Sequence, residues 1–216
     1  LAMVIFRMEP NRIDEEGIKQ AASALRQGKL VIFPTETIYG LAADAFDAGA
    51  AAKVFAAKHR PLNEALPVQI GEKQDIKKVA RNVPAAAQKL IDKFFPGPLT
   101  LILYKNANIP EIVTANGPKI GVRMPNHPVA LELIWTFGCP IIATSANISG
   151  GQEALTAADA VAQVGEHVEV VLDSGPSVLG QASTVVDVTE DPPRITRQGA
   201  LSAEDIEKVI GKVRTE

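Results

Sequence analysis

Hydrophobic and polar positions follow two different periods along the chain, and each period predicts one kind of secondary structure. In residues 18–25 the apolar side chains recur every three or four positions, which is typical of a helix with one buried face. Asp14 is expected to cap this helix, and Gly28 to follow its end. Residues 29–33 form a largely apolar, β-branched run that is typical of a buried strand. Pro34 ends it because proline has no N–H to donate to a neighbouring strand.

The same patterns assign the rest of the chain. Strands are expected over 4–8, 29–33, 66–70, 98–105, 120–123, 140–143, 168–172 and 183–188, and helices over 14–26, 50–58, 73–82, 83–95, 129–135, 157–164 and 202–213. Helix and strand alternate, but at spacings too irregular for a simple series of parallel units. We therefore expect an α+β fold, a single layered domain in which helices flank both faces of a twisted, mixed β-sheet.

Composition sets the size and setting of this domain. A chain of 216 residues with 46% hydrophobic content can bury one substantial core, and no linker or repeat divides it, so one domain over 1–216 is expected. Every apolar run is far shorter than the roughly 20 residues that span a bilayer, so no membrane contact is expected. Leu1 and Ala2 precede Met3 without the pattern of a secretory signal and are interpreted as a cloning remnant. A cytoplasmic location is the resulting expectation.

Cysteine and histidine offer little chemistry. Cys139 is the one cysteine in the sequence, and its apolar neighbours favour a small buried side chain over a nucleophile. The three histidines lie far apart with no spacing typical of a zinc site. No metal is expected to be held by protein side chains.

Charge is distributed unevenly. The formal net charge is −3, yet residues 53–105 contain ten Lys/Arg against four Asp/Glu, and residues 150–216 contain five against twelve. An anionic partner is expected to approach the first of these regions, although solvated helix faces would give the same composition.

Hydroxyl and cationic side chains gather where predicted strands and helices end. These clusters are Thr35, Glu36 and Thr37; Lys58 and Arg60; Arg123; Thr144, Ser145, Asn147 and Ser149; and Ser183 and Thr184 with Arg197. Each alone fits an ordinary turn or a solvated helix end. Together they predict a concave pocket for an anionic ligand, because such groups bind phosphate, carboxylate or ribose oxygens. The sequence contains neither a P-loop nor a dinucleotide-binding glycine motif, and no Ser-His-Asp nucleophile arrangement.

The residues of these clusters resemble the YrdC family of threonylcarbamoyl-AMP synthases. The stretches FPTETIYGL, KHRP, VRMPNHP, TSANISG and ASTVVD occur in the order and at the spacing of that family's motifs. The likeness covers nearly the whole chain and is to the short, single-domain form. It implies the YrdC-like fold, with an open concave cleft.

The resemblance also implies a reaction. L-threonine, bicarbonate and ATP give threonylcarbamoyl-adenylate and pyrophosphate, which supplies the N6-threonylcarbamoyladenosine modification of tRNA. Such a step needs positioning and charge neutralisation more than a covalent nucleophile. Mg²⁺ is expected to arrive with ATP, held mainly by phosphates and water. Downstream proteins that transfer the threonylcarbamoyl group to tRNA are implied partners.

Residue roles follow from the same resemblance. Contacts to L-threonine are expected from Thr35, Thr37, Tyr39, Gln69, Arg123, Ser145 and Ser183, with Arg123 on the carboxylate. Contacts to ATP are expected from Lys58, Arg60, Glu64, Lys119, Ala143, Asn147, Glu153 and Arg197. Lys58 and Arg60 are also expected to be the catalytic cations.

Three positions depart from the family's pattern. Glu64 stands where a neutral nucleotide contact is common, Gln69 where a histidine near threonine is common, and Glu153 where a serine near ATP is common. The two carboxylates would repel a triphosphate unless Mg²⁺ or another cation intervenes. Nucleotide affinity or amino-acid choice is therefore expected to differ from that of other members.

Two other functions fit parts of this pattern. A double-stranded RNA or tRNA binder would use the basic region, yet would not need Ser145, Asn147, Ser183 and Arg197 in one cleft. A carbamoyltransferase resembling the related domain of hydrogenase maturation proteins would take carbamoyl phosphate in place of threonine and bicarbonate.

Overall fold

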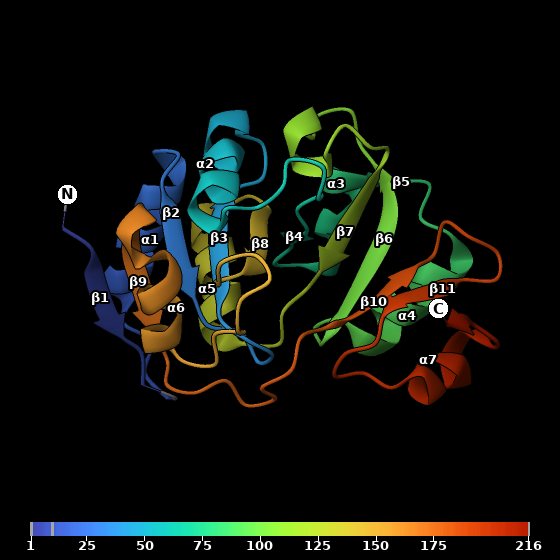
Figure 1. Cartoon of the computed structure of the whole chain (residues 1–216). Helices are drawn as coiled ribbons and strands as arrows, with labels where there is room; N and C mark the ends of the chain where they lie inside the picture. Colours follow the sequence, from blue (N-terminus) through green and yellow to red (C-terminus); the bar gives the residue numbers. More distant parts are fainter. Residues whose placement is uncertain (1, 10, 216) are drawn as a thin grey trace.

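A computed structural model describes residues 2–9 and 11–215, so Leu1, one of the two residues interpreted as a cloning remnant, lies outside the described residues. Within these ranges the chain forms one mixed sheet in the order β1-β9-β2-β3-β8-β4-β7-β6-β10-β11-β12, with β5 paired to β6 (Figure 1). Its strands are β1 (Val4–Arg7), β2 (Leu30–Phe33), β3 (Gly40–Asp44), β4 (Val68–Gln69), β5 (Ala80–Arg81), β6 (Leu99–Lys105), β7 (Lys119–Arg123), β8 (Ile141–Ser145), β9 (Val168–Asp173), β10 (Thr184–Asp187), β11 (Arg194–Arg197) and β12 (Arg214–Thr215). The sheet contains both parallel pairs, such as β2 with β9, and antiparallel pairs, such as β3 with β8.

Helices cover both faces of the sheet. They are α1 (Glu15–Arg26), α2 (Ala48–Lys58), α3 (Ile76–Val79), α4 (Ala85–Phe94), α5 (Pro128–Phe137), α6 (Ala157–Val164) and α7 (Ala203–Ile210), with short 3-10 turns η1 (Lys73–Asp75), η2 (Glu111–Thr114) and η3 (Gly165–His167). Val31 and Phe33 of β2 pack under α1 and α5, whereas Leu30 and Ile32 of the same strand face the core that contains α2 and α6. This alternation follows from the two-residue period of a strand. The expected α+β arrangement of a mixed sheet between helices is confirmed.

Local signals explain where the helices begin and end. Asp14 accepts from Gly17 N at the start of α1, and Thr156 with Asp159 forms a reciprocal capping box at the start of α6. Gly28, at φ +66°, turns the chain from α1 into β2.

Several local predictions are wrong. The helix expected over 73–82 is a 3-10 turn, one turn of α3 and then β5, because Ala80 and Arg81 pair with the edge of β6. The helix expected over 202–213 ends at Ile210, before Gly211 at φ +80°. β3 was absent from the expected strands because its sequence GLAAD is rich in small residues of low strand propensity. Cys139 is exposed rather than buried, since it follows the end of α5 at the surface.

The sheet brings distant segments to one place. Gly40 of β3 pairs with both Phe33 of β2 and Ser145 of β8. A Cβ at Gly40 would lie 2.6 Å from Cε1 of Phe33, so only glycine permits this close approach next to the loop 34–39. Among the described residues, no helix is long and apolar enough to cross a membrane.

Candidate active site

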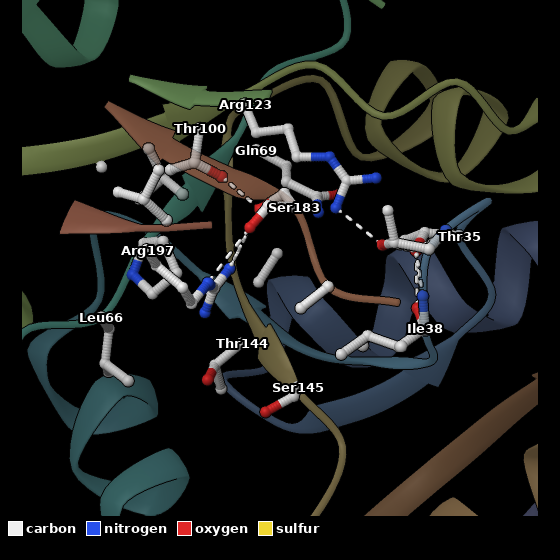
Figure 2. A pocket seen from close by; sticks show the side chains of 18 of the residues that line it. Thr35, Ile38, Leu66, Gln69, Thr100, Arg123, Thr144, Ser145, Ser183 and Arg197 are labelled. Carbon is white, nitrogen blue, oxygen red and sulfur yellow. Dashed lines mark hydrogen bonds between the residues drawn. The ribbon is translucent and has the colours of Figure 1, made fainter. Parts of the chain in front are cut away.

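A cleft crosses one face of the sheet from β3 and β8 to β6 and β10. Its main cavity has a volume of about 310 Å³ and is lined by residues from the loop 35–40, the segment 60–69, β6, β7, β8 and the segment 182–185, together with Glu153 and Arg197. A second cavity of about 370 Å³ adjoins it and shares Arg60 and Ser145 with it. Figure 2 shows the Arg123 guanidinium turned toward the Thr35 loop, and the Arg197 guanidinium turned toward Ser183.

At one end of the cleft, Arg123 is buried and held on three sides. Its Nε donates to Gly97 O at 3.0 Å, its Nη1 to Thr37 Oγ1 at 2.9 Å, and its Nη2 forms an ion pair with Glu36. Burial lowers the pKa of Arg123, and the Glu36 carboxylate opposes that shift. Since a guanidinium has five N–H donors, two stay available for a ligand carboxylate.

The hydroxyl protons beside Arg123 can be assigned from the hydrogen bonds. Thr35 Oγ1 donates to the carbonyl of Ile38 at 2.5 Å, since a carbonyl cannot donate. With that proton used, the 2.9 Å contact between Thr35 Oγ1 and Thr37 Oγ1 assigns Thr37 as the donor, beside the longer bonds that Thr35 Oγ1 accepts from Thr37 N and Ile38 N. Thr37 Oγ1 also accepts from Arg123, which leaves it one lone pair. Toward the cavity, Thr37 thus offers an acceptor, suited to an ammonium or hydroxyl group.

At the other end, Arg197 and Ser183 form a second anchored cation. Arg197 Nη2 donates to Ser183 O at 2.8 Å and to Ser183 Oγ at 3.1 Å, and its Nε donates to the same carbonyl at 3.1 Å. Ser183 Oγ also lies 2.7 Å from Thr100 Oγ1. Burial lowers the pKa of Arg197, and Glu153 opposes the shift. Arg197 Nη1 makes no hydrogen bond to any residue that the structure describes, so it is free to meet an anion.

Arg60 lies between the two cavities, folded onto its own loop. Its Nε donates to Glu64 O at 3.0 Å and its Nη2 to Ala65 O at 2.8 Å, while Nη1 lies 3.5 Å from the Glu64 carboxylate. Burial lowers the pKa of Arg60 and Glu64 raises it. The guanidinium is therefore fixed by backbone carbonyls, with one face toward the second cavity.

Lys58 is more buried than its cationic side chain suggested. It is the last residue of α2, as the expected helix over 50–58 implies, and it is almost fully buried. Its Nζ donates to Ser145 O and, at 2.7 Å, to Asn147 O, with Ser145 Oγ at 3.5 Å, and its carbonyl accepts from Ser149 N at 2.9 Å. Burial, reinforced by Arg60, lowers the pKa of Lys58 to about 8. Lys58 thus shapes the turn after β8 and adds positive charge behind it.

Four more expected site residues lie in the cavity walls, and three of them are used partly by the protein itself. Asn147 Nδ2 donates to Ile148 O and Gly151 O, which closes the turn after β8. Tyr39 lines the main cavity, but its hydroxyl donates to Gly175 O at 2.7 Å and accepts from Ser174 N at 3.0 Å. Ala143 lines the cavity while its N–H donates to Pro67 O. Gln69 is buried in the same wall, and its Oε1 has no hydrogen-bond partner among the described residues.

One expected contact falls outside the cleft. Lys119 lies at the start of β7, lines neither cavity, and pairs with Asp187 Oδ2 at 2.8 Å. Its ammonium is therefore committed to a structural ion pair, and the expected contact with ATP has no support from its position. Every other expected residue lines one cavity or both.

Thr100 gains a role that the sequence did not assign, whereas Thr144 and Glu36 belong to the predicted clusters but had no stated contact. Thr100 of β6 forms a hydrogen bond with Ser183. It lies between the buried Leu99 and Leu101, so its side chain is on the opposite face of the strand. A hydroxyl within this apolar run is the signal in the sequence that could have identified it. Thr144 lines the main cavity. Glu36 binds Arg123, and its Oε2 accepts from Asn126 N at 2.8 Å.

The arrangement suits a ligand with anionic groups at two places. Arg123 and the Thr37 acceptor match the carboxylate and ammonium of an amino acid, whereas Arg60, Arg197 and the hydroxyls of Ser145 and Ser183 match phosphate and ribose oxygens. Among the described residues, no group of three His, Cys, Asp or Glu side chains could hold a metal ion.

Comparisons with known proteins agree with this geometry. Residues 23–199 match the family model Sua5_yciO_yrdC, described as "Telomere recombination". A threonylcarbamoyl-AMP synthase of Pyrococcus abyssi is 43% identical over 212 residues, which cover 98% of this chain and 62% of that protein. A putative threonylcarbamoyl-AMP synthase of Mycobacterium tuberculosis H37Rv is 40% identical over 90% of this chain and 89% of its own length.

A solved structure gives the same result in three dimensions. The crystal structure of P. abyssi Sua5 complexed with L-threonine superposes with a TM-score of 0.96 at 41% identity, over 99% of this chain and 63% of that one. This chain therefore spans less than two thirds of the P. abyssi protein. Since the family match covers most of the sequence and the cleft, the chain belongs to the Sua5/YciO/YrdC family.

Proposed function

We propose that this chain synthesises threonylcarbamoyl-AMP from L-threonine, bicarbonate and ATP, and releases pyrophosphate. The observation that carries the proposal is the single cleft with Arg123 and Thr37 at one end and Arg60 and Arg197 at the other. Relatives at 40% identity or more are named for this activity, and the superposing P. abyssi structure holds L-threonine. A double-stranded RNA or tRNA binder that lacks adenylation would not need this two-ended cleft.

The amino-acid end supports a zwitterionic substrate. The two remaining N–H donors of Arg123 would bind the carboxylate, and the Thr37 lone pair would accept from the amino group or the hydroxyl. Arg123 and Glu36 together carry no net charge, which suits a zwitterionic amino acid that also carries none. Gln69 would complete this end, because a ligand that bonds its amide would relieve an unpartnered buried oxygen.

The reaction requires two bond-forming steps in the same cleft. The threonine nitrogen loses a proton to solvent and takes up bicarbonate with release of water, which gives an N-carboxylate. One oxygen of that carboxylate then attacks the α-phosphorus of ATP as the bond to pyrophosphate breaks. Arg60, Arg197 and the charge of Lys58 would neutralise the phosphate oxygens, and Ser145 and Ser183 would orient the reacting groups.

Magnesium would enter as part of the nucleotide substrate. The described residues offer no acidic cluster that could hold it alone, so phosphates and water would supply most of its ligands. The product, a mixed anhydride of threonylcarbamate and AMP, is a carrier of an activated acyl group. A protein that transfers this group to tRNA would be the next partner.

Pyrophosphate release from MgATP tests the proposal, measured with and without L-threonine and bicarbonate and in an Arg60→Ala variant. Release that needs both co-substrates and falls at least about tenfold in the variant would support the synthase. Release with carbamoyl phosphate in place of threonine and bicarbonate would instead support the carbamoyl-transfer alternative. Steeply salt-dependent RNA binding without nucleotide turnover would support a binding protein.

A further inference from the structure

The Glu64 carboxylate lies against the Arg60 guanidinium beside the second cavity. Two donors of the guanidinium, Nε and Nη2, are bound to the carbonyls of Glu64 and Ala65. The Nη1 group donates to neither carbonyl, and the Glu64 carboxylate lies 3.5 Å from it. Both residues line the second cavity.

The other cation of the cavity cannot replace Arg60 as a direct phosphate ligand. The ammonium of Lys58 donates to the carbonyls of Ser145 and Asn147, and the third nearby acceptor is Ser145 Oγ. A phosphate that binds Arg60 through Nη1 must therefore either displace the Glu64 carboxylate or lie beside its negative charge.

Glu64 is free to act in this way. Its side chain is about half exposed, at 51%, whereas that of Arg60 is 19% exposed, so the carboxylate can move while the guanidinium stays on its loop. Glu153 adds a second carboxylate on the main cavity, near Arg197. Each of the two arginines expected to meet the nucleotide thus has a carboxylate nearby: Glu64 beside Arg60, and Glu153 near Arg197.

We infer that Glu64 makes this site discriminate between the Mg²⁺ complex of a nucleoside triphosphate and the metal-free nucleotide. The inference rests on the proposed function, since it assumes that the cavity takes a triphosphate. Metal-free ATP carries about four negative charges at neutral pH and its Mg²⁺ complex about two, so the carboxylate repels the metal-free form more strongly. When a phosphate of the Mg²⁺ complex binds Arg60, the Glu64 carboxylate can still lie near a cation, the Mg²⁺ ion.

Binding of α,β-methylene-ATP by calorimetry, with saturating Mg²⁺ or with EDTA, tests this inference. The quantity compared is the ratio of the metal-free Kd to the Mg²⁺ Kd. In Glu64→Gln this ratio is expected to fall about fivefold, mostly because the metal-free nucleotide binds more tightly. Glu64→Asp should keep a ratio near that of the wild type.

The matched control is Glu132→Gln on α5, which removes the same charge outside both cavities and should leave the ratio unchanged. Urea unfolding of each variant checks that the fold is intact. A Glu64→Gln ratio within about twofold of the wild-type value overturns the inference alone. A wild-type protein that binds neither form of the nucleotide overturns the proposed function, and the inference with it.

Discussion

Arg123 and Glu36 form a buried ion pair beside the cleft, although 87 positions separate them in the chain. Arg123 ends β7, and Glu36 lies in the loop between β2 and β3. The carboxylate also accepts from Asn126 N, and the carbonyl of Glu36 accepts from Leu179 N. One glutamate therefore fixes Arg123 and joins it to two other segments of the chain.

Removing Glu36 should cost far more stability than removing a surface acid. Glu36→Ala leaves an unpaired guanidinium in the interior and is expected to lower the free energy of unfolding by about 3–5 kcal/mol, measured by urea unfolding. Adding Arg123→Met should recover part of this loss. The control is Glu169→Ala, which breaks the partly exposed Lys29–Glu169 pair and should cost about 1 kcal/mol or less. Equal losses in the two alanine variants would show that the buried pair has no special role.

The proton assignment at Thr37 predicts that its hydroxyl oxygen accepts a hydrogen bond from the ligand. Thr37→Val keeps the shape but removes the acceptor for Arg123 and for the ligand, and should weaken L-threonine binding about tenfold in calorimetry. Thr37→Ser keeps the hydroxyl and should bind within about threefold of the wild type. Unchanged binding by the valine variant would mean that the lone pair of Thr37 meets no donor of the ligand.

Lys58 should make nucleotide binding depend on pH near neutrality. Its pKa of about 8 lies below the ordinary value, so the ammonium loses its proton as the pH rises through that value, and the cavity loses a positive charge. The affinity for an ATP analogue should fall above this pKa, by at most about tenfold per pH unit. Bound phosphate will itself raise the pKa and shift the transition upward. Lys58→Met should bind weakly and without this transition, and a pH profile like that of the wild type would exclude Lys58 as its source.

His127 should make the fold less stable in mild acid. Its Nδ1 accepts from Val129 N as the cap of α5, and burial lowers its pKa below the ordinary value while Glu36 opposes the shift. Between the lowered folded pKa and the unfolded value near 6.5, the unfolded chain binds more protons, so stability falls as the pH falls through this window. His127→Asn keeps a cap without titrating, and should reduce the loss between about pH 7.5 and 5.5 by up to about 1 kcal/mol in urea unfolding. The same pH dependence in both proteins would assign the effect to other groups.

Lys119 should matter to stability and not to ligand binding. Because its ammonium is bound to Asp187 outside the cleft, Lys119→Met should change nucleotide affinity by less than about twofold, while Arg60→Ala reduces it at least about tenfold. Calorimetry with one ATP analogue compares the two variants. A large loss in Lys119→Met would restore the role that the family resemblance implied for it.

The sequence was sufficient for the main plan of the molecule and for most of the cleft. Apolar runs located β2, β6, β7 and β9. The polar residues that follow or end two of these strands, Thr35, Thr37 and Arg123, line one cavity together with Ser183, which precedes β10. This worked because the face of a buried sheet is apolar except where a ligand or a partner requires otherwise.

What could not be predicted depends on partners far away in the chain. GLAAD becomes β3 only because β2 and β8 lie on either side of it, and Arg81 becomes part of a strand only because the edge of β6 is open there. Likewise, Lys58 donates to the carbonyls of Ser145 and Asn147, and the local sequence KHRP gives no sign of these bonds. Cys139 has apolar neighbours in sequence, yet its position after α5 leaves it at the surface.

The contacts that build the cleft also determine when activity can arise. Thr37 meets Arg123 across 86 positions, Thr100 meets Ser183 across 83, and Tyr39 meets Gly175 across 136. Long-range contacts of this kind form late, because loop closure must come before the contacts that reward it. A growing chain on the ribosome would therefore have no working fragment of the site, and binding competence would arise only after Arg197 has been made and has reached Ser183.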